Sequence, residues 1–540
     1  MIKNTFILAL SLIIFSGCED FLDEENNANV TAETFYVTAD GYESLINSNY
    51  AQLREIYGQS PWMFMSGTDL YSAGRGAGPD GLSMYTELNP SSSGANFIYN
   101  EAFQAIGAAN LGLYYNDLTE SVSTLSVRRG ELLYMRANAY FLLVQSYGGV
   151  TLLTEPIQEA VTSFDRNSEA EIYTQIIADL EEAQNLVESG AFSGRVNQRA
   201  VQSLLGQVYL TRAYESFGSG SDFSTASSIL DGVIGGQALN LSFEELWMPG
   251  NDMNEEVIFS VQFDGGSIGP ADNPKGSQQQ NFHGSYLGGS EVAGNAPFKS
   301  YSLCPHQFTL DLFEQGDERW EGTFMTEIYD RYYDYWDVAD RSSLSVAHFY
   351  EPSWFTDADR DAYIAANPNT EYHAYETIYP EGADISNNFN TIVVKKFDDP
   401  TSSFASDGSN RRTSTRDFVV SRLGDVYLLA AEAHLGAGDN ATALSRLNVV
   451  RARAGVADLT AIDIDVILDE RARELIGEYK RWFDLKRTGK LIERASAHNP
   501  WIELSNFDGA NGEQKILRPI PQEALDLNSN KGFTQNPAYN

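Results

Sequence analysis

The chain has 540 residues, of which 42% are hydrophobic and 12% aromatic. This composition lets apolar burial offset the entropy lost on folding, so it excludes a disordered chain. The length exceeds the ~250–300 residues at which one core stops growing, so at least two packed lobes are predicted. The formal net charge of −39 argues against nucleic acid as a partner, because phosphate binding needs clustered lysine and arginine. The chain has only two cysteines, which excludes a scaffold held together by disulfides.

The first seventeen residues have the pattern of a secretion signal. Lys3 supplies a positive start, residues 6–15 form an apolar run too short to span a bilayer, and small residues precede Cys18. This end resembles a bacterial lipobox, in which the cysteine is lipidated and becomes the first residue of the mature protein. We expect Cys304 then to have no disulfide partner. An uncleaved N-terminal helix with a chance cysteine is the alternative.

Acidic residues fill much of positions 19–25, directly after Cys18. Such a run is typical of a solvated leader. It also resembles the start of Bacteroidetes lipoproteins, in which acidic residues at this place accompany export to the outer face of the outer membrane. We therefore expect a protein that is anchored by lipid in the outer membrane and exposed on the cell surface.

Residues 62–99 lack the periodicity of a helix or a strand, because glycines and a proline interrupt them. The glycine-rich stretch 74–78 has no preceding strand, so a flexible loop is a better interpretation than a phosphate-binding loop. Helical patterns follow along the chain. Residues 129–147 form one candidate helix, and residues 170–189 form its amphipathic neighbour.

The segment Leu-Gly-Gln-Val-Tyr-Leu at 205–210 recurs as Leu-Gly-Asp-Val-Tyr-Leu at 423–428. Each copy lies in a helical pattern and is followed by a break that contains glycine and then by a second apolar helix pattern. Paired helices of this kind resemble tetratricopeptide units. An ordinary helical bundle in which the two copies coincide by chance is the alternative. The predicted fold class is all-α, with a helical scaffold at both ends of the chain.

Between these ends, in residues 239–415, the periodicity gives way to glycine, serine, asparagine and aspartate with dense aromatic residues. Short apolar stretches such as residues 257–263 and 391–397 alternate well enough for isolated strands. Long loops on a rigid frame usually carry function. The predicted regions are a signal peptide (1–17), an N-terminal helical region (18–238), a loop-rich ligand-binding insertion (239–415) and a C-terminal helical region (416–540).

Two charged motifs lie in this insertion. Asp317 and Arg319 are predicted to form a buried, charge-assisted clamp, with Trp320 buried beside it. The alternating aspartates of residues 357–361 begin like a calcium loop, but the turn glycine and the final glutamate of such a loop are missing. The start of a helix is therefore predicted there.

The sequence lacks the common signatures of hydrolases, NTPases and zinc sites, and its six histidines offer no pair at i,i+4. We therefore expect no catalytic residues, no metal and no cofactor. One enzymatic alternative stays open, since the 75 acidic residues leave room for two carboxylates at the spacing of a glycoside hydrolase.

Ordered blocks near the C-terminus carry a family resemblance. They are DFVVSRLGDVYLLAAEA from 417, RLNVVRARAG from 446, ERARELIGEYKRWFDLKRTGK from 470, LRPIPQEAL from 517 and QNPAYN at the end. In this order, and together with the lipobox, they resemble the SusD/RagB family of outer-membrane nutrient-binding lipoproteins. Stretches at 103–110, 130–149 and 195–210 agree more weakly. Phe15, Tyr99 and Ala538 stand where the family more often has leucine, tryptophan and glycine.

The resemblance implies a SusD-like, non-catalytic protein that captures an oligosaccharide or polysaccharide and delivers it to a SusC-like TonB-dependent transporter. It also implies that ligand binds on a face built from the two loop-rich stretches. Sugar rings have flat C–H faces, so exposed aromatic rings stack on them while polar groups bind the hydroxyls. The expected ligand-binding residues are Trp62, Asp69, Tyr71, Arg75, Tyr85, Tyr332, Tyr335, Trp336, Asp337 and Trp354.

Two further alternatives concern the ligand. A relative of the same family could bind peptide, which would need main-chain partners and pockets more than an arc of stacking rings. A helical-repeat adaptor would bind the transporter but no glycan. The sequence does not identify the sugar, although the acidic balance favours a neutral glycan.

Overall fold

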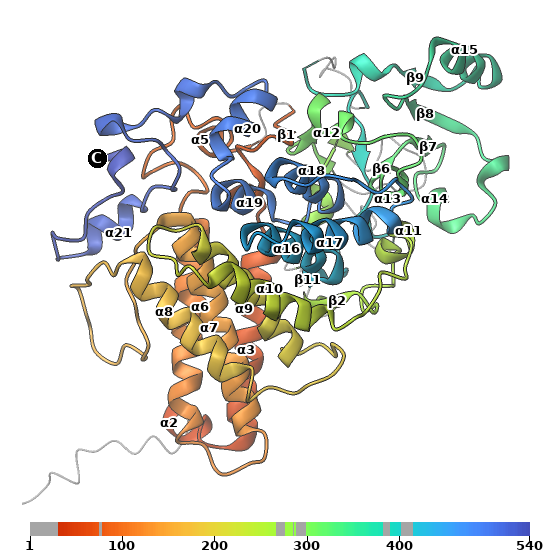
Figure 1. Cartoon of the computed structure of the whole chain (residues 1–540). Helices are drawn as coiled ribbons and strands as arrows, with labels where there is room; N and C mark the ends of the chain where they lie inside the picture. The colour runs from red at the N-terminus through yellow and green to blue at the C-terminus, as the bar shows by residue number, and fades with distance from the viewer. Residues whose placement is uncertain are drawn as a thin grey trace, which may run out of the picture.

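The structure is a computed structural model, and it describes residues 31–74, 78–265, 276–284, 286–287, 299–381, 389–400 and 414–540. The predicted signal peptide, Cys18, the acidic run and Arg75 lie outside the described residues. Figure 1 shows long helices of the first half of the chain as a column at the bottom and a lobe of short strands and loops that projects at the upper right.

The helices of the column pack side by side. They are α3 (Ala39–Gly58), α6 (Phe97–Asn116), α7 (Leu125–Tyr147) and α8 (Glu169–Ala183), and the short α2 (Ala32–Phe35) precedes them. Helix α7 is buried all around from Gly130 to Tyr147, so its residues include Arg136, whose charge needs a buried partner. Asp179 of α8 accepts two hydrogen bonds from it, at 2.7 and 2.8 Å. The two predicted helices are confirmed here, although α8 ends earlier than expected.

The repeated segments lie in α9 (Gln198–Ala213) and α16 (Leu423–Gly436). A partner helix follows each, namely α10 (Asp222–Ile234) and α17 (Asn440–Arg453), so the predicted helix pairs are confirmed. Helix α10 packs against α16, and there Gly436 lets the ring of Phe223 approach so closely that a Cβ would lie 2.2 Å from it. The helices from α6 to α10 and on to α17 thus form one array, in which each helix packs on the next.

The lobe is inserted between α10 and α16, two helices that contact each other. Its strands are β2 (Val257–Val261), β3 (Tyr286–Leu287), β4 (Lys299–Ser300), β5 (Cys304–Pro305), β6 (Phe324–Met325), β7 (Glu327–Tyr329), β8 (Val346–Tyr350), β9 (Glu371–His373) and β10 (Val393–Val394), to which β1 (Tyr71–Ser72) and β11 (Phe418–Arg422) add from outside. Strand β2 pairs antiparallel with β11, while β7, β8 and β9 form a three-stranded sheet. The predicted strand at 257–263 is confirmed, whereas 391–397 contains only the two residues of β10.

Short helices complete the chain. They are α4 (Trp62–Met65), α5 (Asp80–Met84), α11 (Phe243–Trp247), α12 (Gln307–Asp311), α13 (Glu318–Thr323), α14 (Asp334–Asp337), α15 (Asp357–Ala366), α18 (Ile464–Glu474), α19 (Arg481–Arg487), α20 (Leu491–His498) and α21 (Gln522–Leu527). The alternating aspartates begin α15, where the Thr356 hydroxyl accepts the amide of Asp359 at 3.3 Å as an N-cap. The predicted helix start is confirmed.

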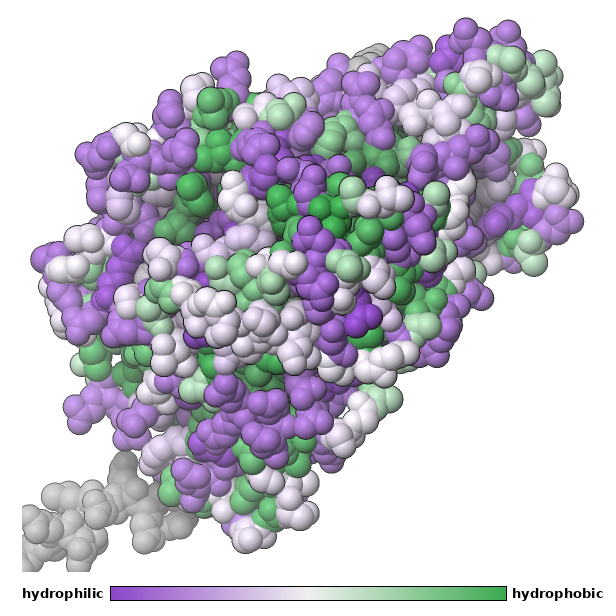
Figure 2. Space-filling view, in the orientation of Figure 1, coloured by the Kyte–Doolittle hydropathy of each residue, from purple (hydrophilic) through white to green (hydrophobic). Residues whose placement is uncertain are grey.

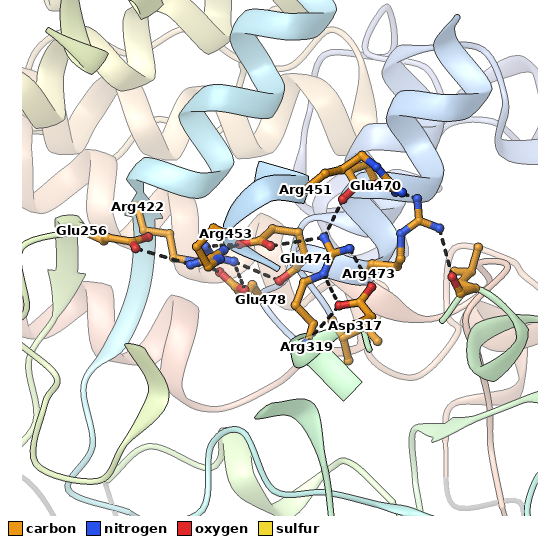
Figure 3. A network of polar contacts seen from close by, with 12 residues as sticks. Glu256, Asp317, Arg319, Arg422, Arg451, Arg453, Glu470, Arg473, Glu474 and Glu478 are labelled. Carbon is orange, nitrogen blue, oxygen red and sulfur yellow. Dashed lines mark hydrogen bonds and ion pairs between the residues drawn. The ribbon is translucent and has the colours of Figure 1, made fainter. Parts of the chain in front are cut away.

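A network of buried charges joins the lobe to the C-terminal helices (Figure 3). Arg319 of α13 donates two 2.8 Å hydrogen bonds to Asp317 and one of 2.6 Å to Glu470 of α18. The three side chains are at most 1% exposed. Glu474, one turn further along α18, accepts from Arg422 of β11 at 2.6 Å. The predicted clamp between Asp317 and Arg319 is confirmed, and its larger role is to fix the lobe on the helical array.

Hydrophilic residues dominate the face of the molecule shown in Figure 2, and hydrophobic residues gather in smaller groups between them. This distribution agrees with the net charge of −39. Among the described residues, Leu527 and Leu504 are the most exposed large apolar side chains. No helix in the described part of the chain combines the length and the apolar character that crossing a bilayer requires.

Candidate functional site

The two loop-rich stretches, residues 62–99 and 239–415, pack against each other although they are far apart in the sequence. Strand β1 of the first pairs antiparallel with β5 of the second. The ring of Trp62 meets the edge of the Phe282 ring, with 5.6 Å between their centroids. The chain therefore builds one continuous region from these stretches, and the expected ligand-binding residues can be located in it.

Asp69 is buried between two arginines, so the expectation that it faces a ligand is wrong. Its carboxylate accepts hydrogen bonds from Arg481 at 2.5 and 2.7 Å and from Arg494 at 3.0 Å. Burial raises the pKa of Asp69, but the two guanidinium groups outweigh this effect and lower the pKa to about 2. The residue ties the loop after α4 to helices α19 and α20.

Tyr71, Tyr85 and Tyr332 are core residues too, each at most 2% exposed, and the expectation that they contact ligand is wrong. The Tyr71 hydroxyl accepts the amide of Gly477 at 3.0 Å, and the Tyr85 hydroxyl donates to the carbonyl oxygen of Gly67 at 2.9 Å. Burial raises the pKa of all three hydroxyls. Large rings with one polar atom fill a core well when that atom has a partner, as here.

Trp336 on α14 keeps an exposed part while neighbouring rings fix its orientation. It contacts Tyr335 edge to face at 5.1 Å between centroids, and Tyr332 and Tyr333 at 6.0 Å each. A ring that is held in this way loses little freedom when a ligand stacks on it. Its contact with a ligand stays a prediction.

Tyr335 is held by three charged neighbours. Its hydroxyl donates to Glu244 at 2.8 Å, and the cationic groups of Lys395 and Arg341 lie 3.8 and 4.2 Å from the centre of its ring. Burial lowers the pKa of Lys395 to about 8. Because cations already occupy its ring, Tyr335 is better suited to support Trp336 than to bind a sugar. The sequence did not indicate that these three side chains meet at Tyr335, since Glu244 and Lys395 come from distant positions.

Trp62, Trp354 and Asp337 also keep exposed parts. Trp354 rests edge-on against Trp320 at 5.1 Å, and Trp320 is 1% exposed, as predicted. Asp337, the residue after Trp336, is paired with Arg331 at 2.6 Å, so its carboxylate lies beside a guanidinium group. A ligand contact of these residues likewise stays a prediction.

A buried ion pair links the Trp336 end of this region to the Trp62 end. Lys299 donates to one oxygen of Asp398, and the other oxygen accepts the Tyr332 hydroxyl at 2.5 Å. Lys299 also donates at 3.1 Å to the carbonyl oxygen of Gln280, close in the chain to the ring that contacts Trp62. Burial lowers the pKa of Lys299 and raises that of Asp398, while their mutual attraction opposes both shifts. The surroundings of Trp336 and Trp62 are thereby connected through buried hydrogen bonds.

Two sizeable hollows in the described part of the chain lie away from these tryptophans. One of about 790 Å³ is lined by residues that include Tyr99 and Phe533, and one of about 650 Å³ by residues that include Arg54 and Arg195. The expected tryptophans therefore do not line either of these two hollows.

Two protein families match this chain. The family described as "SusD family" matches residues 255–539, and the one described as "Starch-binding associating with outer membrane" matches residues 20–210. "SusD-like protein P2" of Formosa agariphila is 24% identical over 99% of this chain and 99% of its own length. A "SusD-like protein" of Bacteroides ovatus is 25% identical over 90% of this chain and 82% of its own length.

Solved structures of the same fold include a "Laminarin binding SusD-like protein", which is 24% identical with a TM-score of 0.70 over 93% of this chain and 100% of that one. The "Surface glycan-binding protein A from Bacteroides thetaiotaomicron in complex with laminarihexaose" is 17% identical, with a TM-score of 0.67 over 93% and 100%. At such identities the likeness concerns the fold, and it confirms the predicted all-α, SusD-like fold class.

Proposed function

This chain belongs to the SusD family, and on that premise we propose that it is a non-catalytic glycan-binding lipoprotein of the cell surface. Relatives of the same fold are named for laminarin and laminarihexaose, which supports a glycan as the ligand. The observation that carries the proposal is Trp336, a partly exposed ring whose orientation three tyrosines fix.

Recognition follows from the chemistry of this face. The Trp336 ring stacks on the C–H face of a sugar, and Trp62 and Trp354 extend the aromatic surface. Asp337 and Arg331, which pair with each other, offer an acceptor and donors for hydroxyl groups. A neutral polysaccharide fits best, because the net charge of −39 repels an anionic polymer. Laminarin is the first ligand to test.

Attachment and delivery complete the proposal. The N-terminal signal and Cys18 place a lipid at the start of the mature protein, and one of the matching families is described by its association with the outer membrane. The protein then holds a captured oligosaccharide over a SusC-like TonB-dependent transporter, as a lid, and passes it on. In this scheme the glycan is a ligand, which the protein binds and releases without breaking a bond.

Affinity gel electrophoresis with laminarin tests the binding face. Trp336→Ala is expected to weaken retention by roughly 30-fold, about the 2 kcal/mol that a central tryptophan contributes to an interface. Trp354→Ala is expected to weaken it as well. Trp501→Ala is the matched control, because Trp501 is 36% exposed but lies outside both loop-rich stretches. Equal retention of Trp336→Ala and the unchanged protein, with both folded by circular dichroism, would refute the assignment.

A further inference from the structure

The three-stranded sheet of β7, β8 and β9 lies in the projecting lobe (Figure 1). Two histidines and a glutamate converge on one of its faces. Strands β8 and β9 run parallel, with His348 opposite Glu371 and Tyr350 opposite His373. Because side chains alternate between the two faces of a sheet, His348, Glu371 and His373 share one face. The opposite face carries Phe349, whose ring stacks on Tyr363 of α15 at 3.8 Å.

The distances within this group match those of a tetrahedral metal site. Nδ1 of His348 lies 3.2 Å from Nε2 of His373 and 3.5 Å from Oε2 of Glu371. The three atoms all lie within 4.8 Å of one another. When a tetrahedral zinc ion has ligands at about 2.0–2.1 Å, two of its ligand atoms are about 3.3 Å apart. Two of the three distances between the proposed ligand atoms are thus close to this value in the structure.

The surroundings fix the two imidazole rings. The Phe389 ring stacks on His348 at 4.1 Å and 15°, and the Tyr350 ring stacks on His373 at 4.6 Å and 13°. The exposed fraction rises across the group, from 5% for His373 to 13% for the side chain of His348 and 52% for that of Glu371. The two imidazoles therefore approach from the protein side, and the carboxylate lies toward solvent.

Both imidazoles are kept in the form that binds metals. Burial lowers the pKa of His348, and burial together with the neighbouring imidazole lowers the pKa of His373 to about 4. Both rings are therefore neutral at neutral pH, and a neutral imidazole nitrogen is a metal ligand.

We propose that His348, Glu371 and His373 bind one divalent transition-metal ion such as Zn²⁺, which links β8 to β9. Two imidazoles and a carboxylate favour zinc and its neighbours over calcium and magnesium, which prefer sites made of oxygen ligands. The fourth position of the ion faces solvent beside Glu371 and takes water or a ligand atom. Strand β8 leads directly to Trp354, so the ion also stiffens the approach to the proposed glycan-binding face.

The test uses the full mature chain with Cys18 replaced by serine, without a histidine tag and freed of metal. Isothermal titration with Zn²⁺ alone is expected to give one ion per chain, and His348→Gln and His373→Gln are each expected to weaken binding at least tenfold. His434→Gln is the control, since His434 lies 3.0 Å from Asp231 and 3.7 Å from Asp439 but has no second imidazole. It is expected to bind Zn²⁺ like the unchanged protein.

A second measurement covers the case in which a variant folds poorly. Zn²⁺ is expected to raise the Tm of the unchanged protein and of His434→Gln but not that of His373→Gln, because only an ion bound to the folded state shifts the melting temperature. No stoichiometric Zn²⁺ binding by the unchanged protein, or equal affinity in His348→Gln, would overturn the proposal and leave a hydrogen-bonded imidazole pair. Glycan retention is a separate measurement, so either proposal can fail alone.

Discussion

Replacing Arg319 by methionine tests whether the buried charge network holds the lobe on the helical array. Methionine keeps an unbranched apolar stem, although a shorter one, and it removes three hydrogen bonds, two to Asp317 and one to Glu470. Breaking a buried ion pair from one side costs about 3–5 kcal/mol, because the partner charge stays buried without compensation.

The structure places this variant at the lower end of that range. Glu470 keeps Arg451 at 3.0 Å and Arg473 at 2.6 Å, so most of the loss falls on Asp317. Asp317 still accepts the backbone amide of residue 319 at 3.0 Å. We therefore expect Arg319→Met to lower the free energy of unfolding by about 3 kcal/mol.

Urea titration followed by circular dichroism at pH 7 measures this loss. Arg129→Met is the control, because Arg129 and Glu182 form a pair whose side chains are 34% and 45% exposed, for which less than about 1 kcal/mol is expected. The double variant Asp317→Asn with Arg319→Met is expected to be more stable than Arg319→Met alone, because it also removes the Asp317 charge that Arg319→Met leaves buried without its guanidinium partner. A loss of stability for Arg319→Met no larger than that for Arg129→Met would show that the buried charge network does not hold the lobe.

Three further predictions concern other parts of the molecule. Asp69→Asn is expected to lower the free energy of unfolding by about 2 kcal/mol at pH 7. Because the pKa of Asp69 in the folded protein, about 2, lies below the ordinary 3.8, urea titrations should show that this loss of stability shrinks as pH falls from 4 toward 2. Laminarin retention should not change. Gly436→Val is expected to cost about 1–3 kcal/mol in urea titrations, because its Cβ overlaps the ring of Phe223. Trp336→Phe, which keeps a smaller ring, is expected to weaken laminarin retention in affinity gels less than Trp336→Ala does.

The helical array could be predicted from the sequence because its signals are local. The apolar spacing within α9 and α16, and the glycine breaks after them, are readable from a few neighbouring residues. The Asp317–Arg319 clamp is local as well, since its partners are two positions apart. Its third partner, Glu470, could not be predicted, because nothing near either residue indicates which helix will pack there.

The aromatic region shows where local reasoning stops. Tyr85 and Trp336 both lie in loop-rich sequence, yet Tyr85 is buried under Trp482 and Arg518, which come from the far end of the chain. The pair His348 and His373 was missed for a related reason. A search at i,i+4 finds ligand pairs on helices, whereas these two residues meet across parallel strands whose register is set by the fold.

The proposed glycan binding is tested most directly by affinity gel electrophoresis of the mature protein, with Cys18 replaced, against a series of neutral and uronic-acid polysaccharides. We expect retention by a neutral polysaccharide, with laminarin first, and weaker retention of Trp336→Ala than of Trp501→Ala on the same gel. Retention by none of the polysaccharides would contradict it and would favour a peptide ligand or an adaptor that binds only the transporter.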